Sequence, residues 1–144
     1  MSDNRAFFDS SAIIPALIQQ PFSTRARRLL RKFQKPVLAW TTPVEVQSAL
    51  FRLYREGHLN ERDCQTALAR FARIEDNSIE VLPTSRLRER AKEILQTYDL
   101  RAADAIQLAS ALLWCSDKPR GKPVISFDKR LVDAATKAGF AVHS

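Results

Sequence analysis

The amino-acid sequence predicts an α/β fold with a mainly parallel sheet of roughly five strands. Short apolar runs alternate along the chain with segments in which apolar residues recur at helical spacing. Strands that alternate with helices form right-handed crossover units, and these place the carboxyl ends of all the strands at one edge of the sheet. No repeat, linker or low-complexity segment interrupts the 144 residues, so we expect a single domain over residues 1–144.

The composition is typical of a globular protein. Hydrophobic residues make up 45% of the chain and charged residues 27%. No apolar run reaches the roughly 20 residues that span a bilayer, and no apolar signal region follows the amino terminus. We therefore expect a cytoplasmic protein with no membrane partner. Cys64 and Cys115 lie in apolar helical patterns, which indicates reduced core thiols, and no Cys/His spacing indicates zinc.

The first predicted strand, Ala6–Phe8, runs directly into Asp9, Ser10 and Ser11. Ligands of open α/β sheets bind in the crevice outside the carboxyl ends of the strands, so Asp9 is expected to face that crevice. A helix follows. Proline is tolerated in a first helical turn but not deeper, so we expect this helix to begin close to Pro15.

The net charge of +7 favours a polyanionic partner such as nucleic acid, although charge alone does not identify a ligand. The next predicted helix carries much of this charge. Its apolar stripe comprises Phe22, Ala26, Leu29, Leu30 and Phe33. The basic residues between them are Arg25, Arg27, Arg28, Arg31 and Lys32. Such a face is either solvated or a track for a phosphate backbone.

The second predicted strand, residues 36–42, leads into a helix that holds a second acid. Thr42 suits the N-cap and Glu45 follows three residues later, which is the pattern of a capping box. The same position, in the first turn of a helix that follows a strand, also brings Glu45 near the crevice that Asp9 faces. Gly57 ends this helix and Asn60 caps the next, so we expect a helical hairpin.

A short strand over residues 78–83 and a helix of mixed charge over residues 87–98 come next. The most apolar helix, residues 100–113, carries Asp104 in its first turn, where the helix dipole favours an acid. Small alanines flank Asp104, and they would let another group approach it closely. The fourth strand, residues 123–127, precedes Asp128, a candidate N-cap of the last helix. Residues 140–142 form the final strand.

Four acids are thus expected at one edge of the sheet: Asp9, Glu45, Asp104 and Asp128. Each one by itself is a cap or dipole partner more often than a catalyst. Together they would repel one another, and a hard cation would relieve that repulsion. Oxygen ligands without Cys or His favour Mg²⁺ or Mn²⁺. On a basic protein, such a site indicates a metal-dependent phosphodiesterase that acts on nucleic acid.

The segments around these acids resemble those of PIN-domain ribonucleases. They read FFDSSAII around Asp9, TTPVEVQSAL around Glu45, LRAADAIQLASAL around Asp104 and VISFDKRL around Asp128. In order and spacing, nearly the whole chain is similar to the VapC-like toxins of type II toxin–antitoxin pairs. Pro15 is not a usual feature of that family, and we have no functional explanation for it.

The resemblance implies a three-layer α/β/α sandwich, a Mg²⁺ or Mn²⁺ site and endoribonuclease activity on RNA. It also implies a homodimer and a cognate antitoxin protein that blocks the site. Asp9 and Asp104 become the main metal ligands, completed by Asp128 and Glu45 directly or through water. Two hydroxyls, those of Ser10 and Ser126, support the ligands. Basic side chains near the acids in sequence are candidates for contacting RNA: Arg101, Lys129 and Arg130.

Two other classes of function are compatible with parts of the sequence. One is a PIN-like module that binds RNA or protein without cutting, which a metal-dependent nuclease assay would identify. The other is a receiver-like domain that accepts phosphate on an Asp. A receiver needs an acid pair near its start and a lysine at a late strand end, whereas Lys122 precedes its strand. Phosphorylation by a small phosphodonor would identify that class.

Overall fold

Five parallel strands form the centre of the fold, which was obtained as a computed structural model that describes residues 3–144. The strands are β1 (Arg5–Phe8), β2 (Lys35–Ala39), β3 (Ile79–Val81), β4 (Pro123–Ile125) and β5 (Ala141–His143). Their order in the sheet is β3-β2-β1-β4-β5, and every neighbouring pair is parallel. The predicted parallel five-stranded sheet is confirmed.

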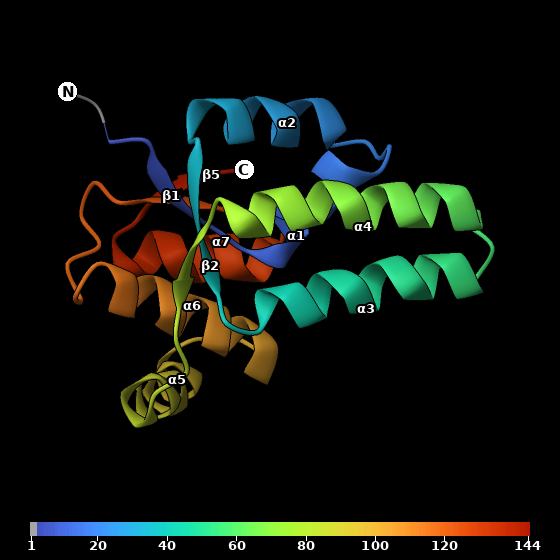
Figure 1. Ribbon diagram of the computed structural model, residues 1–144. Coiled ribbons are helices and arrows are strands. Elements are labelled where there is room, and N and C mark those ends of the chain that lie inside the picture. The colour runs from blue at the N-terminus through green and yellow to red at the C-terminus, as the bar shows by residue number, and fades with distance from the viewer. Residues whose placement is uncertain (1–2) are drawn as a thin grey trace.

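Seven helices cover the two faces of the sheet (Figure 1). They are α1 (Ser10–Leu17), α2 (Ser23–Lys32), α3 (Thr42–Arg55), α4 (Glu61–Asp76), α5 (Ser85–Thr97), α6 (Ala102–Trp114) and α7 (Lys129–Ala138). One hydrophobic cluster joins α1–α4 to the sheet through Phe8 and Leu38. The other joins α5–α7 to the opposite face through Phe7 and Val37. Side chains alternate between faces along a strand, so both helix layers are anchored on the same strands.

Strand β1 lies in the middle and determines where the candidate site forms. Phe7 pairs with Val37 of β2 on one side and with Val124 of β4 on the other. The backbone N–H of Asp9 then donates to the carbonyl of Ile125 at 3.1 Å, which carries the parallel ladder one residue past the strand. Asp9 therefore stands at the carboxyl edge, between the ends of its two neighbouring strands.

Helix α1 begins five residues earlier than expected from Pro15. Asp9 supplies an N-cap, since its side chain accepts a hydrogen bond from the backbone N–H of Ser11, and the helix starts at Ser10. Pro15 consequently lies inside the helix, where it has no N–H for the carbonyl of Ser11. The prediction was wrong because the Asp9 cap and the burial of Ala12, Ile13 and Leu17 determine where the helix begins, and tertiary packing of this kind supports a short helix despite its proline.

Phe22 was predicted to belong to the buried stripe of α2, and this was wrong. The helix begins only at Ser23, and the side chain of Phe22 stays 45% exposed. Ala26, Leu29 and Phe33 of the same stripe are buried as expected. In addition, β2 and β4 end at Ala39 and Ile125, earlier than the apolar runs do.

Within residues 3–144, none of the helices has the length and apolar character needed to cross a bilayer. Cys64 and Cys115 are both buried and form no disulfide with each other, which agrees with the prediction of core thiols.

Candidate active site

Asp9 is the most enclosed of the four acids, with only 3% of its surface exposed. Its Oδ1 accepts from the backbone N–H of Ser11 at 3.0 Å and from Ser10 Oγ at 3.3 Å. Its Oδ2 accepts from Ser11 Oγ at 2.6 Å and from Ser126 Oγ at 2.5 Å. A buried carboxylate is tolerated only when such donors replace its water. These four donors hold the carboxyl group of Asp9 in one orientation.

The two serines that bind Oδ2 also fasten the end of β4 to the start of α1. Ser11 Oγ accepts from the backbone N–H of Phe127 at 2.9 Å, and Ser126 Oγ accepts from the backbone N–H of Asp128 at 3.1 Å. The two hydroxyls lie 3.3 Å apart. The loop that carries Asp128 is therefore tied through hydroxyl groups to the side chain of Asp9.

Glu45 reaches the same edge from the first turn of α3. The capping box predicted for it does not form, because the helix starts one residue earlier, at Thr42, and its cap residue Thr41 makes no side-chain cap bond. Instead, Glu45 Oε1 accepts from Gln107 Nε2 at 2.6 Å and from Thr41 Oγ1 at 3.2 Å. The carboxylate therefore joins the cap residue of its own helix to Gln107 of α6.

The pKa of Glu45 is raised above its ordinary value. Burial is the main cause, and the negative charges of Asp9 and Asp104 add to it. The hydrogen bonds from Gln107 and Thr41 favour the ionised form and lower the pKa, but they do not cancel the effect of burial. Glu45 therefore lies close enough to two other acids for their charges to oppose its ionisation.

Asp104 occupies the first turn of α6, as expected, and its pKa is raised to about 6. Burial is again the first cause, followed by the charges of Asp128 and Asp9. Two cations, Arg101 and Arg130, act in the opposite direction. The pKa of Asp104 is therefore affected by two of the other three acids and by two of the three basic residues predicted to contact RNA.

Asp128 is the N-cap of α7, as one of its two interpretations predicted. Its Oδ1 accepts from the backbone N–H of Leu131 at 3.1 Å. Oδ2 has no hydrogen bond among residues 3–144, and the charge of Asp128 raises the pKa of Asp104. Oδ1 of Asp128 thus caps α7, while the charge of the carboxylate still acts on Asp104. Asp128 can therefore cap the helix and take part in the site.

The four acids come from the ends of β1 and β4 and the first turns of α3 and α6, and their mutual effects on pKa link them into one cluster. Within residues 3–144, no three side chains of the His, Cys, Asp and Glu types are already arranged as a metal-binding group. The chemistry of the donors nevertheless fits a hard cation, since all are carboxylate oxygens and their repulsion is relieved by positive charge. The residues present are therefore suited to Mg²⁺ or Mn²⁺.

Several residues of the site were not anticipated. Gln107, Ser11, Thr41 and Thr42 supply or accept the hydrogen bonds that orient the acids. Gln107 has a recognisable signal, because it is a polar residue three positions after Asp104 within an apolar helix, and it is 1% exposed. Lys129, by contrast, lies exposed on a different hollow, beside Phe22 and Phe127.

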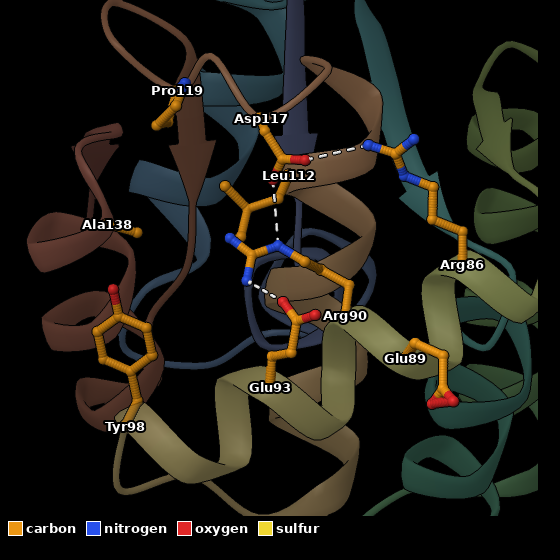
Figure 2. Close-up of a pocket in the computed structure, with 9 residues that line it drawn as sticks. All are labelled: Arg86, Glu89, Arg90, Glu93, Tyr98, Leu112, Asp117, Pro119 and Ala138. Carbon is orange, nitrogen blue, oxygen red and sulfur yellow. Dashed lines mark hydrogen bonds and ion pairs between the residues drawn. The ribbon is translucent and has the colours of Figure 1, made fainter.

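A separate cavity of about 680 Å³ contains none of the predicted site residues. Figure 2 shows Arg90 between Asp117 and Glu93, with Nε 3.1 Å from Asp117 Oδ1 and Nη1 3.0 Å from Glu93 Oε2. Arg86 approaches the same Asp117 at 3.3 Å. The two arginines thus form ion pairs with Asp117 and Glu93, and the pairs with Asp117 hold α5 against the turn after α6. The arrangement explains local structure and does not indicate a ligand.

Comparison with known proteins identifies the family and agrees with the fold. A model of the PIN domain family matches residues 6–137. No curated protein sequence matches the chain at a significant level. The fold is similar to that of FitAcB from Neisseria gonorrhoeae, with a TM-score of 0.65 and 18% identity over 96% of both chains. A toxin–antitoxin complex from Klebsiella pneumoniae matches with a TM-score of 0.62 and 22% identity, again over 96% of both chains.

A third solved structure is the Mycobacterium tuberculosis toxin VapC20, whose description states that it cleaves the sarcin–ricin loop. Its TM-score is 0.65 at 21% identity, over 94% of this chain and 96% of that one. These structures share the three-layer architecture and nearly the full length of the chain. At such low identity, the likeness concerns the fold.

Proposed function

Because the chain belongs to the PIN-domain family, we propose that it is a metal-dependent endoribonuclease and the toxin of a toxin–antitoxin pair. The observation that carries the proposal is the cluster of Asp9, Glu45, Asp104 and Asp128 at the carboxyl edge of the sheet. Two of these acids have raised pKa values because of burial and of the charges of other members. Although Asp9 and Asp128 also cap helices, charge repulsion among four gathered acids is unfavourable without a cation, and perturbed pKa values of this kind favour a functional site.

Each acid has a distinct task in the proposed mechanism. Asp9 and Asp104 would hold the metal ion. Asp128 and Glu45 would complete its ligands, either directly or through water molecules. When bound, the ion lowers the pKa of a water molecule and offsets charge on the scissile phosphate. Ser11 and Ser126 hold the side chain of Asp9 in place, and Ser10 adds a longer contact to the same carboxyl group.

Basic side chains bind the phosphates that flank the cut. Arg101 and Arg130 act on the pKa of Asp104, so they lie near the acids and can neutralise phosphate charge beside them. Lys129 precedes Arg130 on α7 and is exposed, which suits contact with the RNA backbone farther along the strand. Water would attack phosphorus in line with the leaving ribose oxygen. The P–O bond to that oxygen breaks and the oxygen takes up a proton, so one fragment ends in a phosphate and the other in a hydroxyl.

The deciding experiment incubates purified protein with total RNA in Mg²⁺ or Mn²⁺, with EDTA and an Asp9→Asn variant as controls. Asn keeps an acceptor for the N–H of Ser11, and the serine hydroxyls can rotate to accept from its amide, so the fold is retained. We expect discrete cuts that disappear in both controls. Uncut RNA with every metal, from protein shown to be folded, would contradict the proposal and favour a module that only binds.

We propose two protein partners. The first is a cognate antitoxin. This proposal is supported by the similar fold of a chain in the Klebsiella pneumoniae structure, which is that of a toxin–antitoxin complex. An antitoxin that covers the acids would suppress cleavage in the cytoplasm until it is removed. Co-purification with the product of a neighbouring gene, and loss of nuclease activity in that complex, would support this partner.

The second partner is another copy of the chain. An apolar hollow of about 520 Å³ lies between α5 and the start of α6, and Trp40 and Leu95 on its lining are 51% and 44% exposed. Exposed apolar groups of this size favour burial against a partner. Light scattering should report a dimer for the wild type and a monomer for Trp40→Ser. A dimer that persists in this variant would place the interface elsewhere.

A further inference from the structure

We propose that Phe22 and Phe127, with Arg25 and Lys129, form a subsite that takes one unpaired RNA base beside the acidic cluster. This inference rests on the proposed ribonuclease function, since it names how the substrate of the same site is held. The acids would contact the phosphate to be cut, and the aromatic pair would hold the base of a neighbouring nucleotide.

The aromatic pair is the first observation. The rings of Phe22 and Phe127 stack with their centroids 4.9 Å apart and an angle of 22° between their planes. Phe22 remains 45% exposed, while Phe127 is half-buried and packs against the core. Phe22 also occupies the N-cap position of α2, where small polar residues are favoured, and it makes no cap hydrogen bond. Neither the core nor the helix terminus accounts for a phenylalanine here.

The second observation is the hollow that these rings border. It has a volume of about 230 Å³ and is lined by Phe22, Arg25, Phe127, Lys129, Val132 and Ser144. Its walls combine flat apolar surface with two cationic side chains. The guanidinium of Arg25 lies 5.9 Å from the centre of the Phe22 ring and donates to the carbonyl of Ser144 at 2.9 Å. A flat ring attached to a phosphate, which is a nucleotide, matches both features.

Lys129 is free to meet such a phosphate. Its side chain is exposed and makes no ion pair or hydrogen bond with any residue of the described range 3–144. A second hollow of about 340 Å³ also borders Phe22 and is lined by Pro21, Phe22, Thr24, Arg25 and Arg28. Cationic side chains therefore line both hollows that border the exposed ring, which suits a polyanion whose backbone passes it.

The third observation is the connection to the acids. Phe127 lies between Ser126, which donates to Asp9, and Asp128, which belongs to the cluster. Its own backbone N–H donates to Ser11 Oγ, the other hydroxyl bound to Asp9. Neighbouring Cα atoms are about 3.8 Å apart, so the ring is anchored one residue from two parts of the site. The segment that carries one of the two rings is therefore bonded to the residues that orient Asp9, and this link joins the subsite to the site of cleavage.

Stacking selects unpaired bases. In a duplex, neighbouring bases already cover the faces of each ring, whereas single strands and loops can turn a base outward onto an aromatic side chain. All four bases have such a face, so this subsite would favour single-stranded RNA without reading its sequence. We therefore expect specificity for unpaired segments near the cut.

The test measures binding of a short fluorescent single-stranded oligoribonucleotide in EDTA, where no cleavage interferes. Phe22→Ala should weaken binding roughly 10-fold, the effect of losing one stacked base. Phe22→Trp should bind at least as tightly as the wild type, because it enlarges the ring. Tyr54→Ala is the matched control, since Tyr54 is another aromatic residue, 42% exposed, near the end of α3. It should leave binding unchanged.

A second readout follows the base itself. An oligonucleotide with 2-aminopurine at successive positions should lose fluorescence at one position on binding to the wild type, and not on binding to Phe22→Ala. Thermal unfolding of each variant confirms that it is folded. Equal affinity of wild type and Phe22→Ala for the single strand, or an equal loss for Phe22→Ala and Tyr54→Ala, would overturn the subsite.

Failure of the subsite is separable from failure of the proposed function. Metal-dependent cutting with unchanged RNA affinity in Phe22→Ala keeps the ribonuclease and rejects the stacking. Quenched 2-aminopurine without cutting in any metal keeps the stacking and rejects the ribonuclease. If Phe22→Ala binds RNA normally but no longer binds the antitoxin, the rings belong to a protein interface and the inference is wrong.

Discussion

Gln107 Nε2 of α6 lies 2.6 Å from Glu45 Oε1 of α3, and the same nitrogen donates to Thr42 Oγ1 at 3.0 Å. One buried amide thereby joins two helices that begin at the same edge of the sheet. The other atom of that amide, Oε1, is buried and has no hydrogen-bond partner among residues 3–144. The two hydrogen bonds donated by Nε2 therefore orient the amide, and they direct its nitrogen toward Glu45.

Gln107→Leu should shift the pH dependence of cleavage. The hydrogen bond from Gln107 lowers the pKa of Glu45, so its removal raises that pKa and leaves only the hydrogen bond from Thr41 to oppose burial and the charges of Asp9 and Asp104. If Glu45 acts as a carboxylate, the acidic limb of the profile of kcat/KM moves to higher pH, and the maximal rate falls about 10-fold through lost orientation. Gln47→Leu, which changes an exposed glutamine of α3, should do neither. A rate reduced equally at every pH would argue against the role of the hydrogen bond.

Asp104→Asn should stabilise the metal-free protein more at neutral pH than in acid. The folded pKa of Asp104 is about 6, above its ordinary value of 3.8, so the folded state binds the proton more tightly. The stability from this proton is fully present below about pH 4 and is lost as pH rises through about 6. Asn has no proton to lose. Thermal unfolding in EDTA at about pH 4.5 and about pH 7.5 measures the difference. A variant whose advantage is larger in acid would contradict the raised pKa.

Mg²⁺ should raise the Tm of the wild type, because a ligand that binds only the folded state stabilises it. At 100 times its dissociation constant the gain is about 2.7 kcal/mol. Protons compete with the ion for Asp104 and Glu45, whose pKa values are raised, so the gain should shrink toward pH 5. Asp104→Asn should show a much smaller gain at either pH. A shift in Tm that is equal in this variant would mean that Mg²⁺ acts at another place.

Ser126→Ala should impair both stability and cleavage. It removes a donor to Asp9 Oδ2 and the acceptor of the backbone N–H of Asp128. Leaving buried groups without partners costs about 1–3 kcal/mol. Ser10→Ala is the matched control, because Ser10 is less buried and its contact with Asp9 is longer, at 3.3 Å. Chemical denaturation and cleavage rates should both rank wild type first, Ser10→Ala second and Ser126→Ala last.

The parallel sheet was predictable because its signals are local. Apolar runs, helical periodicity and caps depend on a few neighbouring residues, and Asn60 and Asp128 are the N-caps that their sequence context indicated. The approximate positions of the four acids followed from topology, since parallel strands end at one edge. Local signals failed at Pro15, at the Thr42 capping box and at Phe22, where a partner distant in sequence or a competing cap determines the outcome.

The order of the elements, the edge of the sheet near which the acids lie and the basic character of the chain can all be inferred from the amino-acid sequence. How each acid is held depends on contacts between elements that are distant in sequence. Ser126 is 117 residues from Asp9, Gln107 is 62 from Glu45, and the ring of Phe127 meets that of Phe22. Hydrogen bonds, charge–charge repulsion and ring stacking act over a few ångströms in space regardless of separation along the chain. Burial, donors and neighbouring charges therefore became known only when the helices were packed on the sheet.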